Sequence, residues 1–387
     1  MKYVDLRNKN LTSLPNDIDI DVEYLDLSFN CLSTLPETFE LFQKLKILFF
    51  SNNNFVKIPN VISKLKNVEM ISFRNNHLIE VDNIPNTIRW LILTSNHIKH
   101  IKSFGHLYEL RKLMLSGNLL NSLPNDIINC QNLELIRLSN NKFEEVPKCI
   151  FKLNNLAWIS MANNPCFPLP NLPDNINFLD KNNVEYKEKI GEGTSGLVYK
   201  STYNNSDVAM KIYKNIMTSD GLATNEIYIL SFLKPHNNLI NIIGLLYEQD
   251  KLNIQGMIMK LFNNYKQLGN PPTFKTITRD VYENNSEIYT NNNIYLFNQI
   301  ECAVNYLHQN NIIHGDLYAH NIIYNKLNDH PVLTDFGASF VILDKELLNE
   351  FIKIEKRALN ILNNELFYTF AHLKRRFFNK LNDLKTI

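Results

Sequence analysis

The sequence HGDLYAHNII occupies residues 314–323, and TDFG follows at residues 334–337. Within these segments Asp316 and Asn321 are five positions apart, and Asp335 comes fourteen positions later. Asp316 can accept the hydrogen bond of an incoming hydroxyl group, while Asn321 and Asp335 offer the hard oxygen ligands that Mg²⁺ prefers. This order and spacing predict phosphate chemistry, with Asp316 as the catalytic residue and Asn321 and Asp335 as metal ligands.

A glycine-rich segment, IGEGTSGLVYK, lies upstream at residues 190–200. Glycines let a backbone pass close to phosphate groups and donate N–H bonds without side-chain obstruction. The segment VAMK then places Lys211 fifteen residues beyond Gly196, and Glu226 stands fifteen further on in a helical-looking segment. We predict that Lys211 reaches the α- and β-phosphates and that an ion pair with Glu226 orients it. The alternative for Glu226 is a solvated helix charge.

The remaining nucleotide contacts are predicted to be apolar. Ile190, Val198, Ala209 and Ile323 would enclose the adenine ring, and Met259 would lie at the back of its pocket, before a hinge formed by residues 260–262. The predicted ATP-binding residues are Ile190, Gly191, Gly193, Gly196, Val198, Ala209, Lys211, Glu226, Met259, Leu261 and Ile323.

The first half of the chain repeats an LxLxxNxLxxLP unit with a period of 20 to 23 residues, seen most clearly at residues 25–36 and 113–124. About eight such units occur, and Lys9 takes the asparagine position of the opening one. A period in this range with several matching positions per unit is typical of leucine-rich repeats. The repeated asparagine amide is expected to lie inside the coil and to satisfy unpaired backbone groups. These asparagines are Asn30, Asn53, Asn76, Asn96, Asn118, Asn141 and Asn164.

Large side chains recur at the strand positions that should face the concave side of the solenoid. A row of exposed aromatic residues predicts a surface that binds a protein substrate or regulator, although packing against neighbouring parts of the chain is the alternative. The residues placed on this face are Tyr24, Phe49, Trp90, Ile92, Met114 and Trp158.

The repeats and the second half together resemble the bacterial-type leucine-rich-repeat-containing protein kinases. From about residue 186 to 366 the resemblance rests on HGDLYAHNI, DFGAS, the run NNYKQLGNPPTFKTITRDVY and IEKRALNILNNEL. It implies an α/β leucine-rich repeat solenoid followed by an α+β two-lobed protein-kinase-like domain. It also implies ATP and Mg²⁺ as cofactors, with Asp316 in catalysis, Lys211 and the glycines on ATP, and Asn321 and Asp335 on Mg²⁺.

Four prolines close the repeat array, because they break its periodicity near residue 174. We therefore expect a repeat domain at 1–174, a polar linker at 175–185 and a kinase-like domain at 186–387. The kinase-like part divides into an N-lobe at 186–262 and a compact C-lobe at 263–387. The prolines are Pro165, Pro168, Pro170 and Pro173.

The bulk composition narrows the partners and the compartment. The chain has 40 basic and 39 acidic residues among 387, so its net charge of +1 gives no reason to expect nucleic acid as a partner. Its five cysteines show no CxxC spacing, which argues against a disulfide framework and a zinc site. No signal peptide and no run of 18 apolar residues is seen, so we expect a cytoplasmic protein without a transmembrane segment, in its own cell or in a host cell. The oligomeric state is not indicated.

Several positions depart from the wider kinase pattern. Gly315 stands where many kinases carry an arginine, Tyr318 stands where Ser/Thr kinases usually carry a lysine, and Ser339 is the only hydroxyl-bearing residue between Gly337 and Glu355. The segment after DFG is short and lacks APE, and Glu355 is expected to begin the helix that anchors the catalytic loop.

Three functions remain open. The first is an active Ser/Thr-type protein kinase, the second a pseudokinase scaffold that binds nucleotide without turnover, and the third a small-molecule phosphotransferase.

Overall fold

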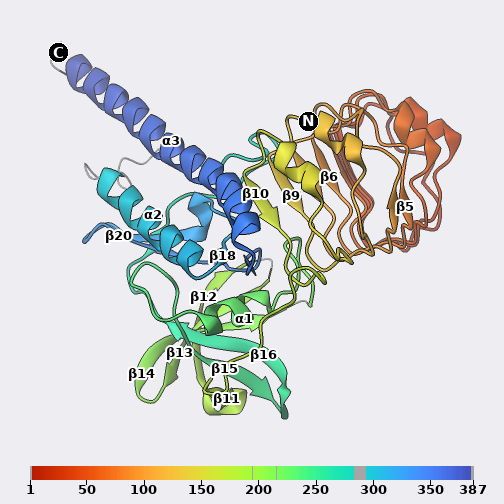
Figure 1. Cartoon of the computed structure of the whole chain (residues 1–387). Helices are drawn as coiled ribbons and strands as arrows, with labels where there is room; N and C mark the ends of the chain where they lie inside the picture. The colour runs from red at the N-terminus through yellow and green to blue at the C-terminus, as the bar shows by residue number, and fades with distance from the viewer. Residues whose placement is uncertain (1, 194, 215, 283–292, 385–387) are drawn as a thin grey trace. The chain divides into compact units, whose positions relative to one another are not determined.

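The computed structural model describes residues 2–193, 195–214, 216–282 and 293–384 (Figure 1). The chain divides into two compact units. Unit 1 comprises Met1–Pro168 and Met217–Leu222, and unit 2 comprises Leu169–Ile216 and Ala223–Ile387.

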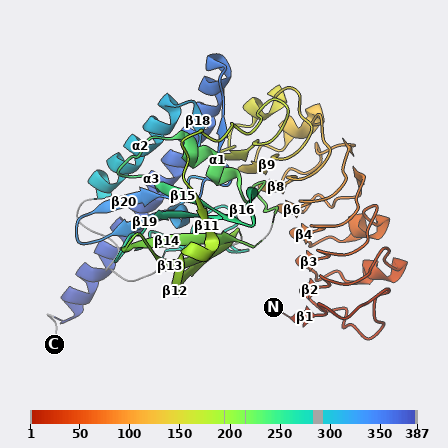
Figure 2. The same cartoon turned by 90° about the horizontal axis from the view of Figure 1, so that it is seen from below.

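Unit 1 is a solenoid built on one parallel sheet of eight short strands, as the repeat pattern predicted. Figure 2 shows these strands in one row along the inner side of the curved unit. Each strand holds three residues, and the central residue of most points into the core because side chains alternate along a strand. The strands in sheet order are β1 (Tyr3–Asp5), β2 (Tyr24–Asp26), β3 (Ile47–Phe49), β4 (Met70–Ser72), β6 (Trp90–Ile92), β8 (Lys112–Met114), β9 (Leu135–Arg137) and β10 (Trp158–Ser160).

Short 3₁₀ helices form the outer side of four repeats, and each begins directly after a proline. Proline suits the start of a helix because its missing N–H would have no partner there. Each of these helices turns at least one apolar residue into the core, such as Phe39 or Ile127. Two other repeats are joined by a pair of parallel two-residue strands instead. These elements are η1 (Glu37–Leu41), η2 (Asn60–Lys64), η3 (Asn125–Asn129), η4 (Lys148–Lys152), β5 (Glu80–Val81) and β7 (His100–Ile101).

The repeated asparagines lie inside the coil and connect successive repeats. In Asn118, the side-chain Nδ2 donates to the carbonyl groups of Leu93 (3.0 Å) and Leu115 (2.9 Å), while Oδ1 accepts from the backbone N–H of Ile98 (3.1 Å). The same pattern recurs at Asn53, at 2.9 Å to Leu27 O and Leu32 N, and throughout the array. Each buried amide therefore satisfies backbone groups of two repeats that the turns leave unpaired.

The concave-face prediction is wrong for two residues. Trp158 is 1% exposed and Met114 is 8% exposed, so neither offers an open aromatic or thioether surface. Tyr24, Phe49 and Trp90 are half-buried. The ammonium group of Lys112 lies 4.4 Å from the centroid of the Trp90 ring.

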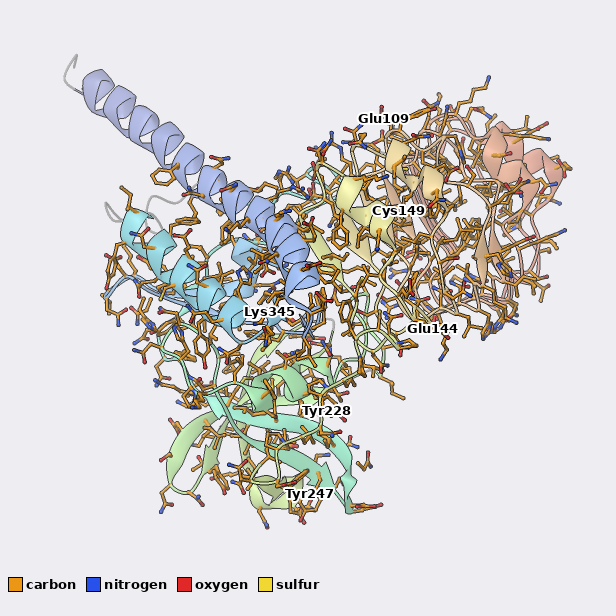
Figure 3. All side chains as sticks on the ribbon, viewed as in Figure 1. Glu109, Glu144, Cys149, Tyr228, Tyr247 and Lys345 are labelled. Atoms are coloured by element: carbon orange, nitrogen blue, oxygen red, sulfur yellow. The ribbon has the colours of Figure 1, made fainter. Side chains whose placement is uncertain are left out.

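The first part of unit 2 is a six-stranded, mainly antiparallel sheet with one helix, α1 (Asn225–Phe232). Apolar side chains of the central strands, including Met210 and Ile258, form its core together with residues from the preceding segment. Figure 3 shows Tyr228 on the helix and Tyr247 on a strand of this sheet. The strands in sheet order are β11 (Phe178–Asp180), β15 (Ile242–Glu248), β16 (Asp250–Lys260), β14 (Ser206–Tyr213), β13 (Gly196–Tyr203) and β12 (Glu185–Glu192).

The expected linker at 175–185 belongs to this sheet. Its strand β11 pairs in parallel with β15, and the short helix η5 (Lys181–Asn183) follows. Leu179 and Val184 are buried in the core of the sheet. The polar composition of the stretch obscured these two apolar anchors, which contact residues far away in the sequence.

The second part of unit 2 contains two long helices and two small sheets. The helix α3 begins at Lys345, ten residues before Glu355, so Glu355 does not begin this helix as expected. Among the described helices, none has an apolar stretch long enough to cross a membrane. All five cysteines are free thiols. The elements are β17 (Lys266–Gln267), α2 (Asn293–Gln309), β18 (Ile312–Ile313), η6 (Ala319–Asn321), β19 (Ile322–Asn325), β20 (His330–Leu333), β21 (Phe340–Val341) and α3 (Lys345–Leu384).

The repeated asparagines give a prediction about the stability of unit 1. Asn118→Ala removes the amide that three backbone groups share, so we expect the free energy of unfolding of unit 1 to fall by at least about 2 kcal/mol. The measurement is urea unfolding followed by tryptophan emission, because Trp90 and Trp158 are the only tryptophans and both lie in unit 1. Asn121→Ala, at an exposed position, should change the unfolding midpoint little. Equal urea midpoints for the two variants would contradict this role of the repeated asparagines.

Candidate active site

A buried ion pair joins strand β14 to helix α1. Lys211 Nζ contacts Glu226 Oε1, and the side chains of both residues are almost entirely buried. Lys211 lies opposite Val198 on one neighbouring strand and Met257 on the other, so the sheet fixes its position. Burial by itself lowers the pKa of Lys211, but the charges of Glu226 and Asp335 outweigh it and raise the pKa above its usual value. Lys211 is therefore charged at neutral pH, as a residue that binds phosphates must be.

The glycines of the 190–200 segment have different structural roles. A Cβ on Gly196 would lie 2.4 Å from the carbonyl oxygen of Ile212, so only glycine fits against β14 at this position. A Cβ on Gly193 would meet nothing within 4 Å, and the Gly193 N–H donates to Gly196 O at 2.9 Å. Gly191 is paired with Val198 on β13. The tip around Gly193 is thus the part of the turn with open space beside its backbone.

Apolar residues predicted to contact the nucleotide base lie on five strands, or directly after one of them. Ala209 and Met259 are paired across β14 and β16 and are buried. Val198 on β13 and Leu261 just after β16 are half-buried, as is Ile323 on β19. The sixth residue, Ile190 on β12, is 47% exposed.

The predicted catalytic residue Asp316 lies in the loop between β18 and η6 and is held by two neighbours. Asn321 Nδ2 donates to the Asp316 carboxylate (Oδ2, 2.7 Å) and to its backbone carbonyl (2.9 Å). The Asp316 N–H donates to His314 Nδ1 at 3.2 Å. Burial lowers the pKa of His314, and its Nε2 lies 3.2 Å from Thr334 O, so the neutral ring with its proton on Nε2 fits both contacts. The carboxylate of Asp316 is oriented before any substrate arrives.

Asp335 is brought to the same loop by the β19–β20 hairpin. The N–H and the hydroxyl group of Thr334 both donate to Asn321 O, at 2.8 and 2.9 Å. Asp335 follows directly with a φ of 54°, and its Oδ1 accepts from the Gly337 N–H at 3.1 Å. The backbone of Asn321 therefore connects the two predicted metal ligands.

The residues present fit a divalent cation. Both hydrogen bonds described for the Asn321 amide are donated by its Nδ2, which leaves Oδ1 as the atom of the amide that can face a cation. The carboxylate of Asp335 adds a charged oxygen donor. An amide and a carboxylate with phosphate oxygens and water are a suitable set for Mg²⁺, which keeps several non-protein ligands.

Glu355 anchors the catalytic loop from within α3. Its Oε1 accepts from the Gly315 N–H at 2.7 Å, and its Oε2 lies 2.7 Å from His308 Nε2 on α2. Gly315 has a φ of 77°, a conformation that favours glycine over the arginine found in many kinases. His308 was missed in the sequence because it lies within the regular pattern of a helix.

A second unpredicted pair holds the other end of the catalytic loop. Asp280 is buried, and its two carboxylate oxygens accept from the backbone N–H of His320 (2.9 Å) and contact its Nδ1 (2.7 Å). Tyr318, at the position of the expected lysine, is buried with its ring centroid 4.9 Å from that of His320. The only signal in the sequence was that Asp280 lies in the run 263–282, to which no role could be given.

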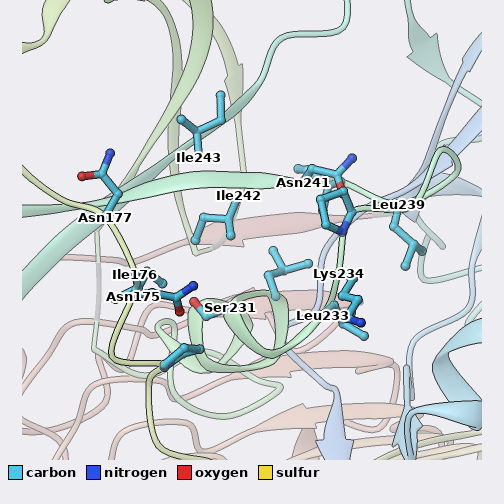
Figure 4. Close-up of a pocket in the computed structure, with 14 residues that line it drawn as sticks. Asn175, Ile176, Asn177, Ser231, Leu233, Lys234, Leu239, Asn241, Ile242 and Ile243 are labelled. Atoms are coloured by element: carbon cyan, nitrogen blue, oxygen red, sulfur yellow. The ribbon is translucent and has the colours of Figure 1, made fainter.

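A pocket of about 240 Å³ lies elsewhere in unit 2 (Figure 4). It is formed by the end of α1, the start of β15 and residues 173–177. None of the predicted site residues lines it.

His320 gives a prediction about pH. Burial alone would lower its pKa, but the hydrogen bond and the charge of Asp280 raise it above the usual histidine value. The contact between protonated His320 and Asp280 thus stabilises the folded state fully below about pH 6.5. This stabilisation is lost as the pH rises through the pKa of His320 in the folded state. We expect the difference in unfolding temperature between wild type and Asp280→Asn to shrink from about pH 6 to about pH 9. Asp174→Asn, an exposed control, should give no such trend, and a constant difference for Asp280→Asn would refute the charged pair.

Two family models match the chain. One, described as a protein kinase domain, matches residues 184–355, and one, described as a leucine rich repeat, matches residues 109–165. Among solved structures, a leucine-rich repeat protein of Leptospira interrogans is 32% identical, with a TM-score of 0.37, and the match covers 38% of this chain and 39% of that one.

Curated relatives each match a little under half of the chain. A protein of Acanthamoeba polyphaga mimivirus, whose name classes it as a serine/threonine-protein kinase, is 28% identical over 196 residues, 48% of this chain and 32% of its own. A second protein of that virus, named in the same way, is 31% identical over 177 residues, 45% of this chain and 31% of its own. A serine/threonine-protein kinase of Arabidopsis thaliana is 26% identical over 183 residues, 45% of this chain and 28% of its own. The chain thus spans about a third of the length of these relatives. Taken with the solenoid and the geometry around Lys211 and Asp316, the two family models show that the chain carries a protein kinase domain and leucine-rich repeats.

Proposed function

We propose that the chain is an ATP-dependent Ser/Thr-type protein kinase, which transfers the γ-phosphate of Mg·ATP to a hydroxyl group of a protein. The observation that carries the proposal is the pair of preformed contacts, Lys211 with Glu226 and Asp316 with Asn321. The first places a fixed cation for phosphate groups, and the second orients a carboxylate for the attacking hydroxyl.

Catalysis in this proposal is mostly positioning. The carboxylate of Asp316 accepts the hydrogen bond of the substrate hydroxyl and aligns its oxygen with the γ-phosphorus. As the new O–P bond forms, the bond from the γ-phosphorus to the β–γ bridging oxygen breaks, ADP leaves, and Asp316 receives the hydroxyl proton. Asn321 prevents the carboxylate from rotating away because its Nδ2 donates both to Oδ2 and to the backbone carbonyl of Asp316. The backbone of Gly193 has open space on the side where a Cβ would lie, so phosphate oxygens can approach the chain there.

Three residues are proposed to offset the negative charge of the phosphates, either directly or through Mg²⁺. They are Lys211, Asn321 and Asp335. Lys211 would contact the α- and β-phosphates, and Asn321 and Asp335 would hold Mg²⁺, whose charge would offset the negative charge of the phosphates. The pKa of Lys211 is raised by the charges of both Glu226 and Asp335, so the cation persists before nucleotide binds.

The scaffold alternative is supported by Tyr318. This residue is buried against His320 and stands where Ser/Thr kinases usually carry a lysine that touches the transferred phosphate. A protein without that cation could bind nucleotide and transfer no phosphate. We favour turnover, because a scaffold has no chemical need for the oriented carboxylate of Asp316. A small-molecule phosphotransferase is disfavoured by the complete glycine loop and by the attached repeats.

Phosphate transfer gives the direct test. We expect wild type with Mg²⁺ and γ-labelled ATP to label itself or a generic protein acceptor, and Asp316→Asn to lower the rate by about 10² to 10⁴ because the hydroxyl is no longer oriented. Lys211→Met and Asp335→Ala should abolish transfer. Asp174→Asn, which removes an exposed carboxylate of unit 2, should leave the rate unchanged. Nucleotide binding without label in wild type would refute the kinase proposal in favour of the scaffold.

The repeats are proposed to recruit a protein partner through their concave face, since repeat solenoids present extended surfaces of this kind. Tyr24, Phe49 and Trp90 are the half-buried aromatic residues that remain available for this role. Tyr24 and Phe49 lie on adjacent strands with ring centroids 5.7 Å apart, which makes a continuous aromatic patch.

A double variant tests this face. Phe49→Ala with Trp90→Ala should release proteins that immobilised wild type retains, because aromatic anchors carry a large share of binding energy. Tyr108→Ala is the matched control, since Tyr108 is 60% exposed and lies outside the strands. Retention of the same proteins by the double variant, measured by quantitative mass spectrometry, would exclude the concave face as the binding site.

A further inference from the structure

The side chain of Asn225, the first residue of α1, contacts the backbone of the DFG segment. Its Nδ2 donates to the carbonyl oxygens of Ser339 (2.8 Å), Gly337 (3.0 Å) and Phe336 (3.3 Å). The residue is 1% exposed. Asn225 directly precedes Glu226, so two adjacent side chains join the start of α1 to β14 on one side and to the DFG segment on the other.

The orientation of the amide is determined by its surroundings. Rotating it by half a turn would direct Oδ1 at three carbonyl oxygens, all of which are acceptors. In the described part of the chain, Oδ1 is buried and has no hydrogen-bond partner. An unsatisfied buried acceptor is unfavourable, so the bonds donated by Nδ2 must offset that cost.

The segment that receives these bonds is strained. Asp335 has a φ of 54°, in the left-handed region that favours glycine, and such a conformation is unfavourable for a residue with a side chain. It persists only where the neighbouring structure holds it. The Gly337 N–H supports it on one side by donating to Asp335 Oδ1, and Asn225 holds the three carbonyl groups that follow.

Phosphorylation is not available to hold the segment. Ser339, the only hydroxyl-bearing residue between Gly337 and Glu355, is fully buried, and its Oγ donates to His314 O at 2.9 Å. Gly315 stands where an arginine could bind a phosphate group. Contacts within the fold must therefore do what a modified activation loop does in other enzymes.

We propose that Asn225 is a positioning residue that keeps residues 336–339 in the conformation that presents Asp335 to Mg²⁺, so that the site is assembled without phosphorylation. This role in catalysis rests on the proposed kinase function, whereas the structural claim rests on the hydrogen bonds of Asn225 and the φ of Asp335. The first turn of α1 then supplies both contacts. Glu226 pairs with Lys211, and Asn225 holds the segment that positions Asp335.

Amide hydrogen exchange of the nucleotide-free full chain tests the structural claim. Asn225→Ala should speed exchange of residues 336–341 about tenfold, because the carbonyl groups lose their donor and the strained segment opens more often. The exchange rate of Asn225→Ser, which keeps one hydroxyl donor, should lie between those of wild type and Asn225→Ala. The matched control is Asn238→Ala. Asn238 is also buried, but its Nδ2 donates to Pro331 O (2.9 Å) and Gln299 Oε1 (3.1 Å), so this variant should leave exchange at 336–341 unchanged.

Nucleotide affinity supplies the second readout. Asn225→Ala should weaken ADP binding about tenfold with Mg²⁺ present and less than about twofold in EDTA, because only the metal-dependent part passes through Asp335. Exchange at 336–341 that is no faster in Asn225→Ala than in Asn238→Ala would overturn the proposal, as would an equal loss of ADP affinity with and without Mg²⁺. If wild type binds no nucleotide, the kinase proposal fails, and the exchange rates alone decide the role of Asn225.

Discussion

The ion pair between Lys211 and Glu226 is the contact on which the proposed nucleotide site of unit 2 depends. Two buried charges are costly to remove from water, and their attraction compensates only where the surroundings hold them in good geometry. The register of β14 between β13 and β16 places the lysine, and the first turn of α1 places the glutamate. Gly256 contributes by its lack of a side chain, because a Cβ there would lie 2.1 Å from Lys211 O.

Asparagine side chains satisfy backbone groups throughout the molecule. In unit 1 the amide of each repeat, such as Asn118, serves a carbonyl group of the preceding repeat and an N–H group beside it. In unit 2, the Nδ2 groups of Asn225 and Asn321 donate to backbone carbonyl groups of the DFG segment and of the loop that carries Asp316. An amide suits the repeat positions because it donates and accepts at once without charge, so it can be buried at less cost than an aspartate.

The catalytic loop is held at both ends by carboxylates that come from distant helices or loops. Glu355 on α3 receives the Gly315 N–H, and Asp280 receives the His320 N–H. Each carboxylate also contacts a histidine side chain, His308 for Glu355 and His320 for Asp280. Each carboxylate therefore contacts one backbone N–H and one imidazole ring. These two hydrogen bonds to the backbone therefore fix the chain on both sides of Asp316.

The sequence by itself determined the repeat solenoid, the two-lobed kinase fold and the order of the site residues. The period of the repeats and the spacing from Gly191 to Asp335 are properties of the chain that each repeat or motif carries locally. The tertiary structure alone decided where α3 begins, that β11 completes the sheet within an expected linker, and that Trp158 and Met114 are buried. It alone also revealed the contacts of Asn225 and Asp280. The partners of Asn225 lie 111 to 114 positions away in the sequence, and the partner of Asp280 lies 40 positions away. Such contacts leave no periodic signal, because a hydrogen bond between distant segments depends on how the chain folds back and not on the residues beside it.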